Sequence, residues 1–379
     1  MKANTEKSFI RRWGKTIALL ANVLVALLLL FSYLAPYISP ENFWYIAFLG
    51  LGYPALLLVN FIFILFWLFL KWRLALISLV SILIGYSNIA ALVQINLSAA
   101  NHEKNHSEKE FKLMSYNVRL FDLYNWTKNK ETRNKIFDLL IEEAPDIICF
   151  QEFYQDDTDG FKTRDTLLAF QKAKYVHEEY TYNYTSKRDT LHIGLATFSK
   201  FPIVGKGVVP FEVKNNNICM FTDVVIQSDT IRIYNMHLQS IHFSNSDYKF
   251  VESIMTDKEA EEEVEKSKKI LSRLKSAFKK RALQAEAVAA HIAKCPYKVI
   301  VCGDFNDTPS SYAYSKISSK LNDAFMEKGF GFGKSYAGKF PSFRIDYILH
   351  SKQLELTDFS IVREELSDHF PICGTFTYR

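Results

Sequence analysis

Apolar residues dominate the first hundred positions of the chain in three long stretches. The first covers residues 17–35 and contains no charged residue, the second covers 43–70, and the third runs from 74 to 96. A helix rises about 1.5 Å per residue, so each stretch is long enough to cross a hydrocarbon layer about 30 Å thick. The pattern predicts a three-helix transmembrane anchor over residues 17–96, preceded by a basic cytoplasmic segment, 1–16. A cleaved signal peptide explains the first stretch less well, because its apolar run is long and its small-residue exit at Ala35 is followed by Pro36.

From residue 111 onward the pattern changes to short apolar or alternating runs bounded by turn residues. Runs of this kind that are rich in β-branched and aromatic residues predict β-strands. The candidates are FKLMSYN, DIICF, LHIGLATFS, ICMFTDVVI, TIRIYNMHL, KVIVCGDF, RIDYILH and FPICGTFTY. Residues 132–143 have helical periodicity, and 246–293 contain a strongly charged helical region. We therefore predict one large α+β domain over residues 111–379, joined to the anchor by a polar linker, 97–110.

The excess positive charge of the chain belongs to the predicted anchor. The chain has 46 basic and 41 acidic residues, a formal net charge of +5, and residues 1–100 alone hold seven basic and two acidic side chains. Five of these basic residues precede the first apolar stretch, and Lys71 and Arg73 separate the second from the third. Because cytoplasmic flanks carry the excess of Lys and Arg, the N-terminus is predicted inside and residues 111–379 outside, on the periplasmic face of a bacterial inner membrane. The remaining residues, 101–379, hold 39 basic and 39 acidic side chains and have no net charge that would favour nucleic acid.

Polar residues able to do chemistry recur at one kind of position, the start or end of a predicted strand. They are Asn117, Glu152, His237, Asp304, Asn306, Asp346, Asp368 and His369. If the strands belong to packed sheets, their ends place these side chains around one mouth. Asn117, Glu152 and Asp368 offer the oxygen ligands that Mg²⁺ or Mn²⁺ prefers. The two histidines and the other two aspartates suit acid–base chemistry at a phosphoryl group.

Each of these residues also has a purely structural interpretation when it is taken singly. His237 could be a hydrogen-bonded core histidine, and Glu152 a solvated turn residue. Asp304 could begin an Asx turn, and Asp346 could pair with Arg344. Five cysteines without a CxxC pair argue against a zinc site and a complete disulfide framework. The functional interpretation therefore depends on the joint occurrence of the eight polar residues along the chain.

The ordered motifs SYNVR, FQE, NMHL, GDFND, RIDYIL and SDHFPI resemble those of the endonuclease/exonuclease/phosphatase superfamily, the deoxyribonuclease-I-like hydrolases. The resemblance covers about residues 111–379. It implies a four-layer αββα sandwich and hydrolysis of a phosphate ester with a divalent metal, Mg²⁺ or Mn²⁺. By this resemblance, Glu152 is the principal metal ligand, with Asn117 and Asp368 beside it.

The resemblance also implies roles for the other five residues. Asp304 orients or deprotonates the attacking water, and Asn306 holds the phosphate. His369, paired with Asp346, stabilises the phosphoryl oxygens of the transition state, and His237 lies near the leaving group. The sequence shows no recognisable partner for His237 and no recognisable loop of the kind that contacts DNA in nucleases of the superfamily. The substrate therefore stays open.

Together these observations predict a membrane-anchored, divalent-metal-dependent phosphoesterase that hydrolyses a phosphodiester outside the cytoplasm. A membrane-tethered endonuclease or exonuclease is the alternative, and a non-catalytic binding or scaffold protein on the same fold is the third. The predicted partners are the lipid bilayer, through three helices, and a phosphate-ester substrate that is a lipid, a nucleic acid or a small molecule. No protein partner is inferred.

Overall fold

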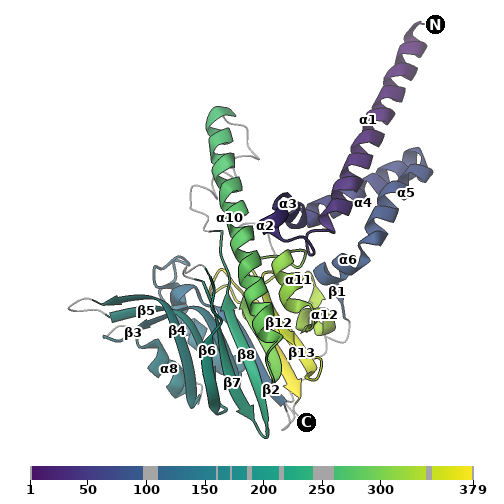
Figure 1. Ribbon diagram of the computed structural model, residues 1–379. Helices are drawn as coiled ribbons and strands as arrows, with labels where there is room; N and C mark the ends of the chain where they lie inside the picture. Colours follow the sequence, from purple (N-terminus) through teal and green to yellow (C-terminus); the bar gives the residue numbers. More distant parts are fainter. Residues whose placement is uncertain are drawn as a thin grey trace.

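The computed structural model describes residues 2–96, 110–158, 161–170, 173–185, 190–212, 217–241, 260–338 and 344–377. Residues 2–96, here called the N-terminal helical region, contain six helices followed by a short strand. They are α1 (Lys2–Ser32), α2 (Pro40–Phe43), α3 (Tyr45–Leu51), α4 (Tyr53–Leu70), α5 (Trp72–Ile84), α6 (Tyr86–Leu92) and β1 (Gln94–Ile95). Figure 1 shows this region at one end of a β-sandwich built from the rest of the chain.

Two helices of the N-terminal helical region are long and apolar enough to cross a membrane, the part of α1 from Arg12 to Ser32 and the whole of α4. The pair α5 and α6, bent by 66°, is a third candidate if it forms one span. The bounds differ from those read from the sequence. α1 continues back to Lys2 without a break, and the apolar stretch 43–70 is divided among α2, α3 and α4. Pro54 lies in the first turn of α4, where a missing backbone N–H leaves no intrahelical bond unmade.

The sandwich consists of two mixed six-stranded sheets that pack face to face (Figure 1). The first has the strand order β13-β14-β2-β3-β5-β4, and the second has the order β10-β12-β9-β8-β7-β6. The bounds in the first sheet are β2 (Glu110–Asn117), β3 (Ile147–Asp156), β4 (Tyr175–Thr185), β5 (Thr190–Ser199), β13 (Glu355–Ile361) and β14 (Ile372–Thr377). Those in the second are β6 (Ile203–Val208), β7 (Ile218–Ile226), β8 (Asp229–His237), β9 (Lys298–Asp304), β10 (Asn322–Asp323) and β12 (Asp346–His350). Each sheet has one parallel pair, β2 with β3 and β8 with β9.

Helices cover both outer faces of the sandwich. They are α7 (Thr132–Glu143), α8 (Thr163–Phe170), α10 (Ala260–Ile292) and α11 (Tyr312–Ser318). A further short helix, α12 (Ala324–Lys328), instead contributes Ala324 and Phe325 to the cluster between the sheets. Leu113 of β2 packs in the cluster between the sheets, whereas its neighbour Met114 packs with Ile136 of α7 on the outer face. A third cluster joins the second sheet to α10 and α11. Because strand residues alternate between faces, each sheet contributes to two apolar layers. The predicted four-layer αββα sandwich is confirmed.

All the predicted strands of the sandwich and the helix at 132–143 are present. The sequence analysis missed β4, β6, β10 and β13, which are the edge strands of the two sheets. An edge strand buries less of its surface, so its apolar pattern is weaker, and β6 in addition alternates between half-buried and exposed residues. The charged helical region predicted over 246–293 contains α10, while its residues 246–259 lie outside the described residues. The predicted linker lies outside them as well, apart from Glu110, which begins β2.

Candidate active site

One half of the candidate site is a row of three side chains across adjacent strands of the second sheet. His237 ends β8, Asp304 ends β9, and Asp346 begins β12. In the strand register His237 is paired with Asp304, which is paired in turn with Asp346. The His237 Nε2 atom lies 3.6 Å from Asp304 Oδ2. Strand pairing therefore brings these residues together although 109 positions separate the first from the last in the sequence.

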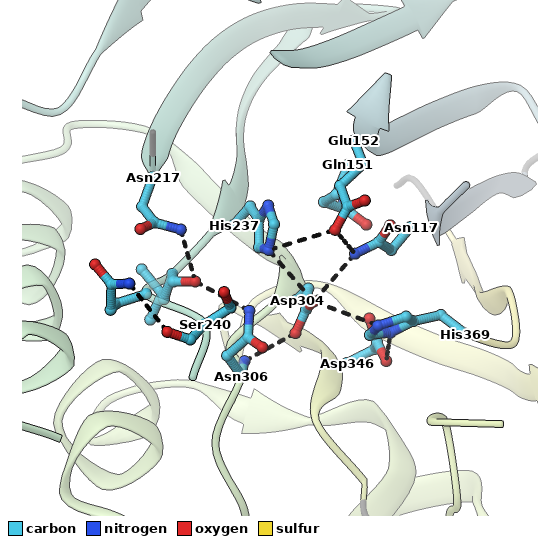
Figure 2. Close-up of polar contacts among 12 residues, drawn as sticks. Asn117, Gln151, Glu152, Asn217, His237, Ser240, Asp304, Asn306, Asp346 and His369 are labelled. Carbon is cyan, nitrogen blue, oxygen red and sulfur yellow. Dashed lines mark hydrogen bonds and ion pairs between the residues drawn. The ribbon is translucent and has the colours of Figure 1, made fainter. Parts of the chain in front are cut away.

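The other half comes from the first sheet. Asn117 ends β2, and its side-chain amide donates hydrogen bonds to Asp304 Oδ2 at 3.1 Å and to Glu152 Oε1 at 3.4 Å. Glu152 Oε1 in turn lies 4.0 Å from His237 Nε2 (Figure 2). These contacts join the two sheets across the open end of the sandwich. They also supply the partner that the sequence analysis could not identify for His237, whose Nε2 atom faces Glu152 and Asp304.

Glu152 reaches the site because β3 is irregular at this point. The register between β3 and β5 shifts between Phe150 and Phe153, so Gln151 and Glu152 lie opposite a single residue of β5. Glu152 has a φ angle of 51°, in the left-handed region that a residue with a Cβ rarely adopts. A bulge of this type turns consecutive side chains toward the same side. It places Gln151 between the sheets and Glu152 at the mouth, as Figure 2 shows.

His369 forms the most deeply buried ion pair of the site. Its Nδ1 atom lies 2.9 Å from Asp346 Oδ2, and its Nε2 atom lies 3.6 Å from Asp304 Oδ2. Burial alone lowers the pKa of His369, but the carboxylates of Asp346 and Asp304 outweigh it and hold that pKa well above its usual range. Burial also raises the pKa of Asp304, and the charge of His369 offsets part of this rise. The raised pKa favours the imidazolium form of His369.

A glycine and a left-handed residue shape the turn that follows Asp304. Gly303 has a φ of 131°, and a Cβ there would lie 2.1 Å from the carbonyl oxygen of Met236, so only glycine lets β9 approach β8 this closely. Asn306 has a φ of 53°, and its backbone N–H donates to Asp304 Oδ1 at 2.8 Å. The Asn306 side chain donates to the carbonyl oxygen of Leu238 at 3.0 Å. These bonds fix the Asp304 carboxylate and the Asn306 amide relative to each other.

Asp368 is the one predicted site residue that joins the others indirectly. Its carboxylate pairs with Arg119, Nε to Oδ2 at 3.3 Å, and Arg119 also lies over the ring of Trp126. The hydroxyl of Ser367 donates to the carbonyl oxygen of Asn117 at 2.8 Å and to Asp368 Oδ1 at 3.3 Å. The structure thus links seven of the eight predicted residues by direct side-chain or backbone contacts and places Asp368 beside them through Ser367.

Sequence analysis missed several residues that hold this arrangement. Gln151 and Asn235 are fully buried and connect the two sheets beneath the site, and Ser335 accepts hydrogen bonds from the backbone at the start of β12. Arg119 neutralises Asp368. A signal existed for the first two, because Gln151 and Asn235 are polar residues inside otherwise apolar strand motifs, where an unpaired amide would be costly.

Two sets of residues in the site have the chemistry of metal ligands. Asp304, Asp346 and His369 each offer a ligand atom, and these atoms lie within 4.8 Å of one another. The other set comprises Glu152 and Asn117, with Asp368 nearby. A histidine must be neutral to bind a metal, and the raised pKa of His369 opposes that. The oxygen donors around Glu152, whose side chain is 35% exposed, therefore fit a hard cation better.

The fold and this set of residues define a phosphoester-hydrolase type of sandwich, and comparison with known families agrees. The sequence profile of the Endonuclease/Exonuclease/phosphatase family matches residues 114–369, more than half of the chain, and the chain belongs to this family. A separate profile, a domain of unknown function (DUF8431), matches residues 15–92. No curated protein matches the chain.

Solved structures show the same sandwich at low sequence identity. A humanised TDP2 of D. rerio is 15% identical with a TM-score of 0.50, and the alignment covers 72% of this chain and 100% of that one. The human Nocturnin catalytic domain with bound sulfate is 18% identical, with a TM-score of 0.49 and coverage of 72% and 94%. A family protein from Bacteroides thetaiotaomicron is 16% identical, with a TM-score of 0.49 and coverage of 73% and 97%. At these identities the likeness concerns the fold alone.

Proposed function

We propose that the protein is a membrane-anchored phosphoesterase that uses a divalent metal, Mg²⁺ or Mn²⁺, to hydrolyse a phosphodiester outside the cytoplasm. The observation that supports it most strongly is the convergence of three side chains, those of His237, His369 and Asn117, on one carboxylate oxygen, Asp304 Oδ2. Family membership supports the same reaction class. A buried aspartate surrounded by two histidines and an amide is costly to maintain for stability alone.

Water activation is assigned to Asp304. Its Oδ1 is held by the backbone N–H of Asn306, while Oδ2 faces the mouth between His237 and His369. An ionised carboxylate in this position accepts a proton from a water that attacks phosphorus. Because burial raises the pKa of Asp304, the carboxylate is a stronger base than an exposed aspartate.

Stabilisation of the negative charge that develops on the phosphoryl oxygens is assigned to His369 and Asn306. The imidazolium of His369, fixed by Asp346, can donate from Nε2 to a phosphoryl oxygen without changing its orientation. The Asn306 amide lies at the same turn as Asp304 and can hold a second oxygen. His237, 15% exposed at the mouth, is placed to protonate the leaving oxygen.

The metal is assigned to Glu152, with Asn117 and Asp368 as neighbours. Asn117 Oδ1 accepts from the backbone N–H of Arg119, so its amide is oriented, and the ligand sphere has room for water because Glu152 is partly exposed. When bound, a divalent cation there polarises a phosphoryl oxygen and offsets developing negative charge.

Anchoring is supported by the two to three membrane-length helices of the N-terminal helical region. The five basic residues that precede the apolar stretch of α1, with Lys71 and Arg73 at the junction of α4 and α5, support an orientation with the N-terminus inside and the site outside. A membrane-tethered nuclease remains the alternative activity within the same fold. The neutral charge of residues 101–379 gives it no electrostatic support.

The proposal is tested with full-length protein in detergent, assayed on bis(p-nitrophenyl) phosphate with Mg²⁺ and with excess EDTA. Glu152→Ala and His369→Ala should each lower the rate by about 10²-fold or more. The control is Glu365→Ala, an exposed glutamate close in sequence to the site. A measurable wild-type rate that neither variant changes would exclude this site, and a rate insensitive to EDTA would exclude the metal.

A further inference from the structure

The sandwich packs directly against the N-terminal helical region. α10 packs on α2 and α3, where the ring of Phe278 meets that of Phe48 edge to face at 5.1 Å and Lys279 Nζ lies 3.5 Å from a Glu41 carboxylate oxygen. β1, which directly follows α6, pairs with β11 (Phe330–Gly331) of the sandwich. Contacts on two sides of the interface therefore fix the orientation of the sandwich relative to the apolar helices.

Two of the docking contacts involve the chain segments that carry catalytic residues. Gly50 of α3 lies against the backbone of Ser310, and a Cβ on Gly50 would be 2.9 Å from the Ser310 carbonyl oxygen. Ser310 is four residues from Asn306, so their Cα atoms lie within about 14 Å. The buried guanidinium of Arg344 donates to the carbonyl oxygen of Ala91 in α6 at 2.9 Å and pairs with Asp323 at 2.6 Å. Arg344 is two residues from Asp346, within about 7 Å.

The strand directions place the site on the side of the sandwich that faces the helical region. β14 begins just after His369 and runs to the C-terminus, which lies at the bottom of Figure 1, away from α1 and α4. β2 is antiparallel to β14, so Asn117 at its end lies on the same side as His369. The mouth of the site is therefore close to one end of the apolar helices, the end beside which α2, α3 and β1 lie.

These distances match the dimensions of a membrane surface. The headgroup layer on each side of a bilayer is about 5–8 Å thick. A site held within about 7–14 Å of residues that contact the extracytoplasmic helix ends lies at or just above that layer. A phosphate in a lipid headgroup can reach such a site without leaving the bilayer, whereas a long polymer must enter between the sandwich and the membrane surface.

We propose that the substrate is a phosphodiester borne by a lipid of the same bilayer, taken from its extracytoplasmic leaflet, and that Gly50 and Arg344 position the site at headgroup level. The inference rests on the proposed phosphoesterase function. It requires that the rigid docking, and not only the presence of an anchor, governs which substrates are accepted. Hydrolysis then depends on the mole fraction of the substrate in the membrane, because enzyme and substrate meet within one surface.

The experiment uses full-length protein reconstituted into vesicles of a bacterial polar-lipid extract with Mg²⁺, and mass spectrometry of released headgroups. The same extract after mild alkaline deacylation supplies the same headgroup diesters in soluble form. We expect release from intact lipids to exceed release from deacylated ones by about tenfold or more, since docking supplies the orientation. The rate should be unchanged when the vesicles are diluted at constant composition.

Two further substrates separate failure of this inference from failure of the proposed function. Faster hydrolysis of the deacylated diesters, or of single- or double-stranded oligonucleotides, overturns the lipid assignment and leaves the phosphoesterase standing. Hydrolysis of bis(p-nitrophenyl) phosphate without any loss of vesicle lipid has the same meaning. No hydrolysis of any of these substrates in Mg²⁺ or Mn²⁺ overturns the proposed function itself.

A matched pair of glycine variants tests the role of docking. Gly50→Ala places a methyl group against the Ser310 carbonyl and the Ala35 side chain, whereas a Cβ at Gly14 of α1 meets nothing within 4 Å. Gly50→Ala should lower vesicle-lipid hydrolysis about tenfold and leave bis(p-nitrophenyl) phosphate hydrolysis within about twofold, and Gly14→Ala should change neither. Equal effects on both substrates, or none, contradict the inference. If Gly50→Ala does not fold, Phe48→Ala, which removes the ring contact with Phe278, is tested in its place. The same ratio of vesicle-lipid hydrolysis to bis(p-nitrophenyl) phosphate hydrolysis is then compared with that of the wild type.

Discussion

Gln151 donates a hydrogen bond of 2.7 Å to the side-chain oxygen of Asn235, and this bond joins the two sheets directly beneath the site. Gln151 precedes Glu152, and Asn235 lies two residues before His237. Asn235 also donates to the carbonyl oxygens of Phe150 and Ala196, so one buried amide holds three positions of the opposite sheet. The distance between the Glu152 side and the His237 side of the site is therefore set by a polar contact inside an apolar core.

Asn235→Leu should destabilise the protein by about 1–3 kcal/mol, because it leaves the Gln151 amide and two carbonyl oxygens buried without this partner. Urea unfolding followed by tryptophan fluorescence measures the change. Asn134→Leu, at an exposed position of α7, is the control and should stay within about 0.5 kcal/mol of the wild type. Adding Gln151→Leu should recover part of the loss, and an Asn235→Leu protein as stable as the wild type contradicts this role.

Asp346→Asn should lower the turnover number by about 10²–10⁴-fold with little change in KM for bis(p-nitrophenyl) phosphate, because His369 keeps its place but loses the charge that holds it protonated. Steady-state kinetics measures this. Asp165→Asn, on the exposed surface of α8, controls for removal of a carboxylate. A higher KM with an unchanged turnover number would mean that Asp346 serves substrate binding and not the chemical step.

His177, which is not one of the candidate site residues, should make the free energy of unfolding depend on pH. Its Nδ1 atom lies 2.8 Å from the hydroxyl of Thr222 in the other sheet, and burial lowers the pKa of His177 although Glu179 opposes the shift. The unfolded chain therefore binds a proton more readily than the folded one. The stabilisation contributed by the neutral, buried His177 is therefore fully present above a pH of about 6.5. It is lost as the pH falls from about 6.5 toward the lowered pKa of His177.

His177→Gln should flatten the decline in the free energy of unfolding between about pH 6.5 and pH 5, measured by urea unfolding at several pH values. Asn134→Leu, which removes no titratable group from the exposed face of α7, should retain the wild-type slope. An unchanged slope in His177→Gln would show that the buried imidazole does not titrate in this range.

The sequence predicted the central strands and the residues at their ends because both depend on local pattern. β9 and its GDFND turn, for example, combine an apolar run with Gly303, at a backbone geometry that only glycine accepts. The family motifs then gathered eight residues from distant positions. Edge strands such as β6 escaped prediction because their half-exposed residues lack the apolar signal.

The relations that the sequence could not predict are those set by tertiary packing. The bulge that turns Glu152 to the mouth depends on the pairing of β3 with β5, and no residue in the FQE motif predicts a bulge. Arg344 resembled a partner of Asp346, but its guanidinium instead pairs with Asp323 and contacts the helical region. The sequence analysis also did not predict the close contact between Gly50 and Ser310.

The most direct test of the account is the Mg²⁺ dependence of bis(p-nitrophenyl) phosphate hydrolysis by the full-length wild type and by Glu152→Gln, which keeps the size of the side chain and removes its charge. The account predicts a saturable Mg²⁺ requirement in the wild type and, in the variant, a rate lower by about 10²-fold or more with a higher half-saturating Mg²⁺ concentration. A wild-type rate that persists in EDTA, or a variant with the same Mg²⁺ dependence as the wild type, would contradict it.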